Sequence, residues 1–435
     1  MKIGIKLVVV ISIINLIGIG LLAGVTLIQS QREISRMANE HAIDLAVQGG
    51  EKITSWFGDY IVAVRAVAQA MEAYQEIPAP VRRDYFNTAL KQVYLANPEL
   101  TSVYANWAPN MLDGMDTEYA NSQGTDASGR YIPAWAKRDG ELFLTPILGF
   151  DWDMIKQMPL FGEEYMIDPT VYTGIDGKIS LIANMGAPIR DNSALIGVAG
   201  CVLELSTIQA IAEEIKPFGD GFIFVFSSGG LIAAHPDPER LGKNIRESET
   251  DTFGPLLDTM VDAVTKGTAT SFSYQPPQSD TVMQYYAVPF TIGQVPLPWT
   301  LVVGVSRNTI MAPVYRMLTI CLIIGVLTIL LVFIGAIFIA RSVSRPIAYT
   351  MTVLKDIAEG DLTKEIAVSS KDEVGDLARY LNFTVDKINS LVLSIRHEAD
   401  SLSQTGTELA ANTTQTAASI TEITASVQSV KGQTG

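Results

Sequence analysis

Two long runs of apolar residues divide the chain. The first covers residues 7–29 with only mild polar interruptions, and the second covers residues 317–340 without a charged side chain. A helix rises about 1.5 Å per residue, so about 20 apolar residues cross a hydrocarbon core of roughly 30 Å. The pattern therefore predicts two membrane-spanning helices, the first preceded by a short N-terminus of residues 1–6.

Basic residues indicate which side of the membrane each part occupies. Lys2 and Lys6 precede the first run, and Arg341 and Arg345 follow the second. Lysine and arginine gather at the cytoplasmic ends of spans, so both termini are expected in the cytoplasm and residues 30–310 outside the inner membrane. The alternative for the first run is a cleaved signal peptide. The apolar region of such a peptide has roughly 7–15 residues, and this longer run favours an uncleaved anchor.

Between the runs, the spacing of apolar positions predicts helices and strands. Steps of three and four predict a long amphipathic helix over residues 31–73 and further helices over 80–96 and 207–216. Short apolar stretches bounded by turn residues predict two sets of strands, at 101–108, 130–136, 142–144, 179–183 and 195–205, and then at 222–227, 231–235, 268–274, 282–288 and 299–305.

The two sets of strands define two units, over about residues 78–205 and about 218–305. Hairpin connections join most neighbouring strands, which favours antiparallel sheets with helices on one face. The predicted fold class is therefore an α+β segment between two transmembrane helices.

Apolar positions beyond the second run form two helical stripes. The first contains Ile347, Met351, Leu354 and Ala358. The second runs through Val374, Leu377, Leu381, Ile388, Leu391, Ile395, Leu402 and Leu409. Steps of three, four and seven are typical of coiled coils, so the C-terminal part is predicted to be all-α.

The net charge of the chain comes from one segment. The formal net charge is −15, and residues 31–315 hold 34 acidic and 19 basic side chains, which accounts for all of it. Nucleic-acid binding requires a basic surface, so no nucleic-acid partner is expected. The two cysteines, Cys201 and Cys321, lie in different predicted parts and form no disulfide framework.

Several short motifs resemble the double Cache sensor domains of bacterial receptors. They lie at residues 129–135, 176–178, 187–189, 197–200 and 235–243, and the similarity covers about residues 35–305. The resemblance implies two stacked PAS-like sheets on a long N-terminal helix. It also implies that the first unit lies far from the membrane and the second near it.

The segment after the second run resembles a HAMP domain, over residues 341–393. Pro346 begins its first helix, Gly360 and Asp361 lie in a connector, and Asp372 and Glu373 begin its second helix. Carboxylates at a helix N-terminus bond its free N–H groups and oppose its dipole. The resemblance implies a parallel four-helix coiled coil, and therefore a homodimer.

Residues 394–435 resemble the start of the signalling coiled coil of methyl-accepting chemotaxis receptors. Around Glu422 the chain is rich in small residues, as in the methylation region of that family, but Thr421 occupies the first position of the usual Glu/Gln pair. Glu422 is thus a candidate methyl acceptor, and a solvated coiled-coil glutamate is the alternative. The resemblance implies contacts with a chemotaxis kinase and a coupling protein, expected through a region that this chain does not contain.

The main alternative is the sensor of a histidine kinase or cyclase. A phosphorylated histidine would be followed on its helix by an acidic residue and then a proline, whereas His397 and Glu398 are followed by Ala399 and Asp400 with no proline close behind. The sequence contains no catalytic constellation and no grouped metal ligands, so neither enzymatic activity nor a cofactor is expected.

Aromatic and acidic residues concentrate in the first unit, which predicts a pocket for a small ligand. The candidates are Trp107, Arg130, Trp135, Asp151, Trp152, Asp153, Tyr165, Asp168 and Tyr172. The alternative is that some of them, Trp135 above all, belong to the sheet core.

Two departures from the family pattern bear on the ligand. Cache domains that bind amino acids carry an arginine for the carboxylate where this chain has Phe150, and an aspartate for the amine shortly after the position of Gly200, where this chain has none. A free α-amino acid would lose both of its charged partners. The excess of acid favours a cationic or hydroxyl-rich ligand.

Overall fold

The computed structural model divides into two compact bodies. One contains Val25–Thr319, and the other contains Met1–Gly24 and Ile320–Gly435. The structure describes residues 3–138, 140–147, 149, 151–173, 179–367 and 371–432. Phe150 and the motif at residues 176–178 therefore lie outside the described residues.

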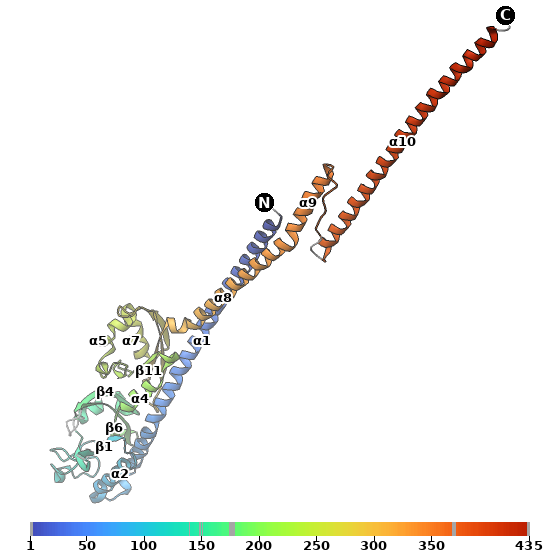
Figure 1. The fold of residues 1–435 in the computed structure, drawn as a ribbon. Helices are drawn as coiled ribbons and strands as arrows, with labels where there is room; N and C mark the ends of the chain where they lie inside the picture. The colour runs from blue at the N-terminus through green and yellow to red at the C-terminus, as the bar shows by residue number, and fades with distance from the viewer. Residues whose placement is uncertain are drawn as a thin grey trace. The chain divides into compact units, whose positions relative to one another are not determined.

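A single helix, α1 (Ile3–Glu72), begins the chain and contains the helix predicted over residues 31–73. Its buried positions include Ile53, Phe57 and Val64, at steps of four and seven that place them on one face. They belong to the largest hydrophobic core, to which both sheets contribute. Figure 1 shows both sheets beside this helix.

Two glycines let α1 approach the second sheet closely. A Cβ on Gly49 would lie 2.7 Å from Leu301 Cδ1, and a Cβ on Gly50 would lie 3.0 Å from Phe290 Cβ. Such contacts are shorter than ordinary packing distances. The pair does not interrupt the helix, which continues through it.

The first sheet has six strands in the order β3-β2-β1-β6-β5-β4, and its pairings are antiparallel. Helix α2 (Arg82–Ala96) precedes it and buries Phe86 and Leu90. The strands are β1 (Leu100–Trp107), β2 (Pro133–Arg138), β3 (Glu141–Pro146), β4 (Tyr165–Thr173), β5 (Ile179–Asp191) and β6 (Ala194–Glu204). We call α2 and this sheet, with their connecting segments, the first subdomain.

The second sheet has the order β8-β7-β11-β10-β9 and is also antiparallel. Its strands are β7 (Phe222–Phe226), β8 (Ile232–Ala234), β9 (Thr270–Tyr274), β10 (Met283–Phe290) and β11 (Trp299–Ser306). Together with α4 (Ser206–Glu214) and α7 (Leu257–Lys266), it forms the second subdomain.

The second sheet is covered on both faces, not on one as the sequence suggested. Ile223 and Val225 belong to the core shared with α1, whereas Phe224 and Phe226 belong to a separate core with α7. Alternate residues of a strand point to opposite faces, so one strand supplies both cores. The apolar positions of α7 at Met260, Val261 and Val264 complete the second core, and the sequence reading did not identify this helix.

Strand β11 leads directly into α8 (Arg307–Ile339), which contains the second apolar run. Two continuous helical segments contain a stretch that is long and apolar enough to cross a membrane: Val9–Glu72 within α1, and Arg307–Ala358, which begins with α8. A π-helical turn, Ala340–Ser344, follows α8, and in it the Arg345 N–H donates to the Ala340 carbonyl. The backbone then continues into α9.

Helix α9 (Arg345–Ala358) and helix α10 (Glu373–Gly432) are joined by a connector. Val353, Ile366 and Ala378 form a small core between them. Asp372 caps α10, because its Oδ1 accepts hydrogen bonds from the N–H groups of Val374 and Gly375 at 3.1 and 3.2 Å. The predicted carboxylate cap is thus confirmed for Asp372.

Candidate functional site

A hollow of about 570 Å³ lies in the first subdomain. Two segments line it: the loop between β1 and β2, and the segment that leads from β3 into α3 (Trp152–Gln157). Its lining consists of Pro109, Asp126, Ser128, Arg130, Ile132, Ile147, Gly149, Asp151, Trp152, Asp153 and Met154. A volume of this order accommodates a small molecule.

Four of the nine predicted residues meet in this hollow. Arg130 comes from the β1–β2 loop, and Asp151, Trp152 and Asp153 begin α3. Trp152 also packs against a buried cluster that contains Ile155, so its indole forms part of the wall. The contact of any of the four with a ligand stays a prediction.

The other five predicted residues lie elsewhere. Trp107 and Tyr165 are fully buried, and the Tyr165 hydroxyl lies 2.9 Å from that of Tyr104 within the sheet. The Trp135 indole donates to the Asn87 carbonyl of α2 at 2.8 Å.

Asp168 and Tyr172 both lie on β4. The Asp168 carboxylate accepts from the Gly229 N–H of the second subdomain at 3.2 Å, and Tyr172 is exposed. Trp107, Trp135 and Tyr165 therefore pack within the first subdomain, and Asp168 contacts the second subdomain. None of the five residues, Tyr172 included, lines the hollow.

Asp126 and Ser128 also line the hollow, although the sequence analysis did not predict them as site residues. Asp126 Oδ1 accepts from the Ser128 N–H at 2.9 Å, the Ser128 hydroxyl at 2.6 Å and the Arg130 N–H at 3.1 Å. This turn brings the carboxylate beside Arg130, whose Nε lies 3.4 Å from Asp126 Oδ2. An Asp-x-Ser-Gly run is a recognisable turn signal, and it could have identified the pair.

The hollow is acidic. Asp126 balances the buried guanidinium of Arg130, and Asp151 and Asp153 are further, exposed carboxylates of the lining. Burial alone would raise the pKa of Asp126, but hydrogen bonds from Ser128 and Arg130 outweigh it and hold that pKa below its usual range. The arrangement can therefore attract a cation.

A buried arginine holds the β1–β2 loop in place. Arg83 of α2 forms ion pairs with Asp113 and Asp116 at 2.7 Å each, and it also donates to the Gly129 carbonyl at 2.8 Å. Burial would raise the pKa of Asp113, but hydrogen bonds from Arg83 and the Met115 N–H keep it below its usual range. The loop that carries Asp126 and Arg130 is thereby anchored to α2.

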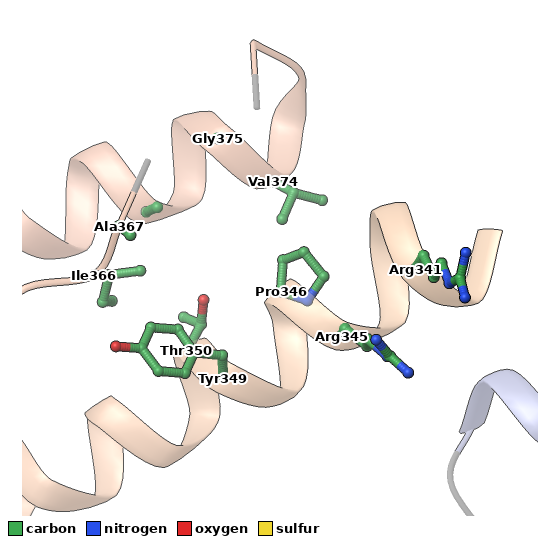
Figure 2. Close-up of a pocket in the computed structure, with 10 residues that line it drawn as sticks. Arg341, Arg345, Pro346, Tyr349, Thr350, Ile366, Ala367, Val374 and Gly375 are labelled. Atoms are coloured by element: carbon green, nitrogen blue, oxygen red, sulfur yellow. The ribbon is translucent and has the colours of Figure 1, made fainter. Parts of the chain in front are cut away.

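A second hollow, of about 270 Å³, lies between α9, its connector and α10. Figure 2 shows Pro346, Tyr349 and Thr350 of α9 facing Ile366 and Val374, with Arg341 and Arg345 at one end. The described residues that line it are mostly apolar and include no carboxylate. Among the described residues, no three His, Cys, Asp or Glu side chains are grouped to hold a metal ion.

Comparison with known families gives two matches. The Cache domain model matches residues 27–314, and the HAMP domain model matches residues 338–390. The first match covers more than half of the chain, and the second covers the π-turn, α9 and the start of α10.

Curated relatives are chemotaxis proteins. The methyl-accepting chemotaxis protein TlpQ of Pseudomonas aeruginosa is 24% identical over 366 residues, which is 76% of this chain and 49% of TlpQ. McpC of Bacillus subtilis is 28% identical over 231 residues, 53% of this chain and 32% of McpC. The chain thus spans half or less of the length of these relatives.

Solved structures show the same sensor fold. The extracellular domain of the putative histidine kinase mmHK1S-Z3 has a TM-score of 0.56 at 22% identity, covering 64% of this chain and 98% of that domain. The periplasmic sensory domain of the Campylobacter jejuni chemoreceptor Tlp1 has a TM-score of 0.52 at 15% identity, covering 64% of this chain and 99% of that domain. At these identities the likeness concerns the fold alone.

The anchored loop predicts unequal effects at two glycines. Gly129 has a φ of +81°, and a Cβ there would lie 1.6 Å from the Asp116 carbonyl oxygen; Gly114 has a φ of +74° and open space around it. We expect Gly114→Ala to lower the free energy of unfolding by about 1 kcal/mol and Gly129→Ala by about 3 kcal/mol or more. Urea unfolding of the detergent-solubilised chain, followed by tryptophan fluorescence, measures both; equal effects would contradict the clash.

The low pKa values of Asp113 and Asp126 predict a loss of stability in acid. An unfolded aspartate titrates near pH 3.9, at about its reference value. Both folded-state pKa values are lower, so ionisation stabilises the folded state above about pH 4, and this stabilisation is lost as the pH falls through the folded-state values. The Tm should fall between about pH 5 and pH 2. Asp126→Asn should flatten this dependence, whereas Asp280→Asn, at an exposed position, should keep the wild-type slope.

Proposed function

The chain belongs to the Cache domain family and carries a HAMP domain, and on this premise we propose that it is a transmembrane chemoreceptor of the cytoplasmic (inner) membrane. Residues 30–310 lie outside and bind a small molecule in the hollow of the first subdomain. The signal passes through α8 and the HAMP segment to the coiled coil of α10, which controls a chemotaxis histidine kinase with its coupling protein. The proposal assigns no catalytic step to this chain.

One observation carries this proposal: a sensor sheet continues without a linker into an apolar helix and then into a HAMP segment. Strand β11 ends at Ser306, and α8 begins at Arg307. A displacement of β11 along its axis therefore moves the start of α8 directly. Helix shifts of about 1–2 Å are typical of switching proteins, and a two-state coiled coil amplifies them. We expect Asp or Glu at Ile347 or Leu381 to lock the output.

The proposed ligand is a small cation or a polyhydroxylated molecule. The lining contains three carboxylates, Asp126, Asp151 and Asp153, and the one guanidinium of Arg130, which is already paired with Asp126. A free carboxylate on the ligand would meet no unmatched positive charge among these described residues. An ammonium or a set of hydroxyl groups would find acceptors at Asp151 and Asp153.

The alternative output is a histidine kinase or a cyclase. Extracellular domains of putative histidine kinases share this sensor fold, so the sensor does not decide between the outputs. Small residues of α10 around Glu422 and the absence of a proline shortly after His397 favour the receptor. Glu422 is exposed on α10, and its methylation stays a prediction. Sequencing the genomic locus beyond Gly435 tests which of the two outputs applies.

The coiled coil is proposed to form with a second copy of the chain. Leu391, Leu402 and Leu409 of α10 are at least 63% exposed, and Ile420 continues the apolar stripe. Because exposed leucines at heptad positions are stabilised only when a partner helix covers them, a parallel homodimer accounts for the stripe.

The ligand hypothesis predicts which substitutions weaken binding. Asp151→Asn and Asp153→Asn should each raise the Kd of a cationic ligand about tenfold, since each removes one charge-assisted contact. Asp280→Asn, at an exposed position of the second subdomain, is the control and should leave the Kd unchanged. Calorimetry of the full chain in nanodiscs against amines, sugars, carboxylates and amino acids measures this. Tight binding of a neutral L-amino acid would refute the proposed ligand class.

The dimer hypothesis predicts a position-specific cross-link. In a Cys321→Ala background, Leu402→Cys should form an intermolecular disulfide readily under mild oxidation, because the stripe places both copies of residue 402 at the dimer seam. Ser401→Cys, one position away on the helix, is the matched control and should cross-link several-fold more slowly. Non-reducing electrophoresis of membranes gives the readout, and equal rates at both positions would count against the seam.

A further inference from the structure

A buried carboxylate, Glu164, joins the wall of the hollow to the two parts of the chain that lead into the apolar helices. Glu164 follows η4 (Pro159–Gly162) and precedes β4, and its side chain is 5% exposed. It forms an ion pair with Arg65 of α1. Its other oxygen, Oε2, accepts a hydrogen bond from the Gln294 N–H at 2.8 Å.

The first connection of this junction, to the wall of the hollow, runs through the backbone next to Glu164. Trp152 lines the hollow and packs against the buried cluster of Ile155, Phe161 and Tyr165. The rings of Phe161 and Tyr165 meet edge to face with centroids 4.6 Å apart, and Glu164 lies between these two residues in the chain. Close-packed clusters resist independent movement of their members, so a displacement of Trp152 moves the backbone that carries Glu164.

The second contact is with α1, and the third is with the loop over residues 291–298. Arg65 lies on the same helix as the first apolar run. The loop joins β10 to β11 and follows α1 closely, because the Thr54 hydroxyl donates to the Thr291 carbonyl at 2.8 Å and Gly293 packs against Ile61. Strand β11 continues from this loop into α8.

The chemistry of the junction requires a charged group. A carboxylate accepts at both oxygens, and here one oxygen meets a guanidinium and the other a backbone N–H. Removing one partner of a buried charged pair leaves the remaining charge uncompensated, which is destabilising. Through these two contacts, the same side chain holds all three segments. An amide at this position offers one acceptor instead of two and presents its N–H₂ group to a second donor.

We propose that Glu164 is the positioning residue through which the hollow of the first subdomain acts on α1 and on the β10–β11 loop. This inference rests on the proposed receptor function, because it names the junction by which a ligand at the hollow reaches both apolar helices. Its structural part, the mechanical linkage of the three segments, is testable without a ligand.

The test is hydrogen exchange of the full chain in nanodiscs, read in peptides covering residues 58–69, 151–163 and 291–298. Glu164→Gln should speed exchange in 291–298 about tenfold, since the Gln294 N–H loses a charged acceptor. Glu163→Gln is the matched control: Glu163 is the exposed neighbour, and this change should alter none of the three peptides.

A second substitution separates coupling from local packing. Trp152→Ala, at the wall, should speed exchange several-fold in all three peptides of the otherwise unchanged chain. In the Glu164→Gln background it should act on 151–163 alone, so the two effects on 291–298 are not additive. Additive effects, or no response of 291–298 to either change, would overturn the proposal.

Arg65→Met provides a route that keeps the carboxylate if Glu164→Gln yields too little folded protein. It removes the α1 contact and leaves the Gln294 hydrogen bond, so Trp152→Ala should then affect 291–298 but no longer 58–69. Loss of both effects, or retention of both, would contradict the two-armed junction. Failure to find a ligand would count against the proposed function and leave these results unchanged.

Discussion

The packing of one helix against two sheets is the constraint on which the sensor depends. Helix α1 contributes buried residues from Ala38 to Met71 to a core that includes β1 and β6 of the first sheet and β7 and β11 of the second. Neither sheet covers this face by itself, so each subdomain is stabilised by the same helix. Small residues lie where the second sheet approaches closely, at Gly49 and Gly50, and large ones such as Ile53 and Phe57 fill the space beyond. The order of small and large side chains along α1 therefore sets the position of each sheet on the helix.

The buried ion pairs of this domain have a different role from its apolar core. Buried ion pairs seldom add much net stability, but they select one arrangement over others because an unpaired buried charge is costly. Arg83 fixes the loop that forms one side of the hollow, and Glu164 ties the segment that forms the other side to α1. Asp151 and Asp153, which line the hollow, are exposed. The paired charges thus fix the walls, while the exposed ones remain accessible to solute.

Local patterns in the sequence predicted much of the architecture, and long-range contacts account for what was missed. The apolar runs, the long helix and most strands follow from periodicity alone. Strand β4 was missed because its register shifts between Ile167 and Thr170, where Asp168 and Pro169 interrupt the alternation. At the hollow, Asp151, Trp152 and Asp153 are consecutive and were readable together, whereas Asp126 reaches them only through the fold. Trp107 and Tyr165 were candidates because an aromatic side chain has the same appearance in sequence whether it lines a pocket or fills a core.

The π-turn between α8 and α9 determines which way the apolar face of α9 points. A π-turn accommodates one residue more than an α-helical turn, and each residue of an α-helix turns its neighbours by about 100°. The Arg345 N–H reaches back to Ala340, so the apolar face of α9 is rotated from where an unbroken α-helix would place it. The rotation of α9 about its axis relative to α8 thus depends on the one additional residue in this turn. A one-residue deletion there acts as a rotation of everything downstream, even though no side chain of α9 or α10 has changed.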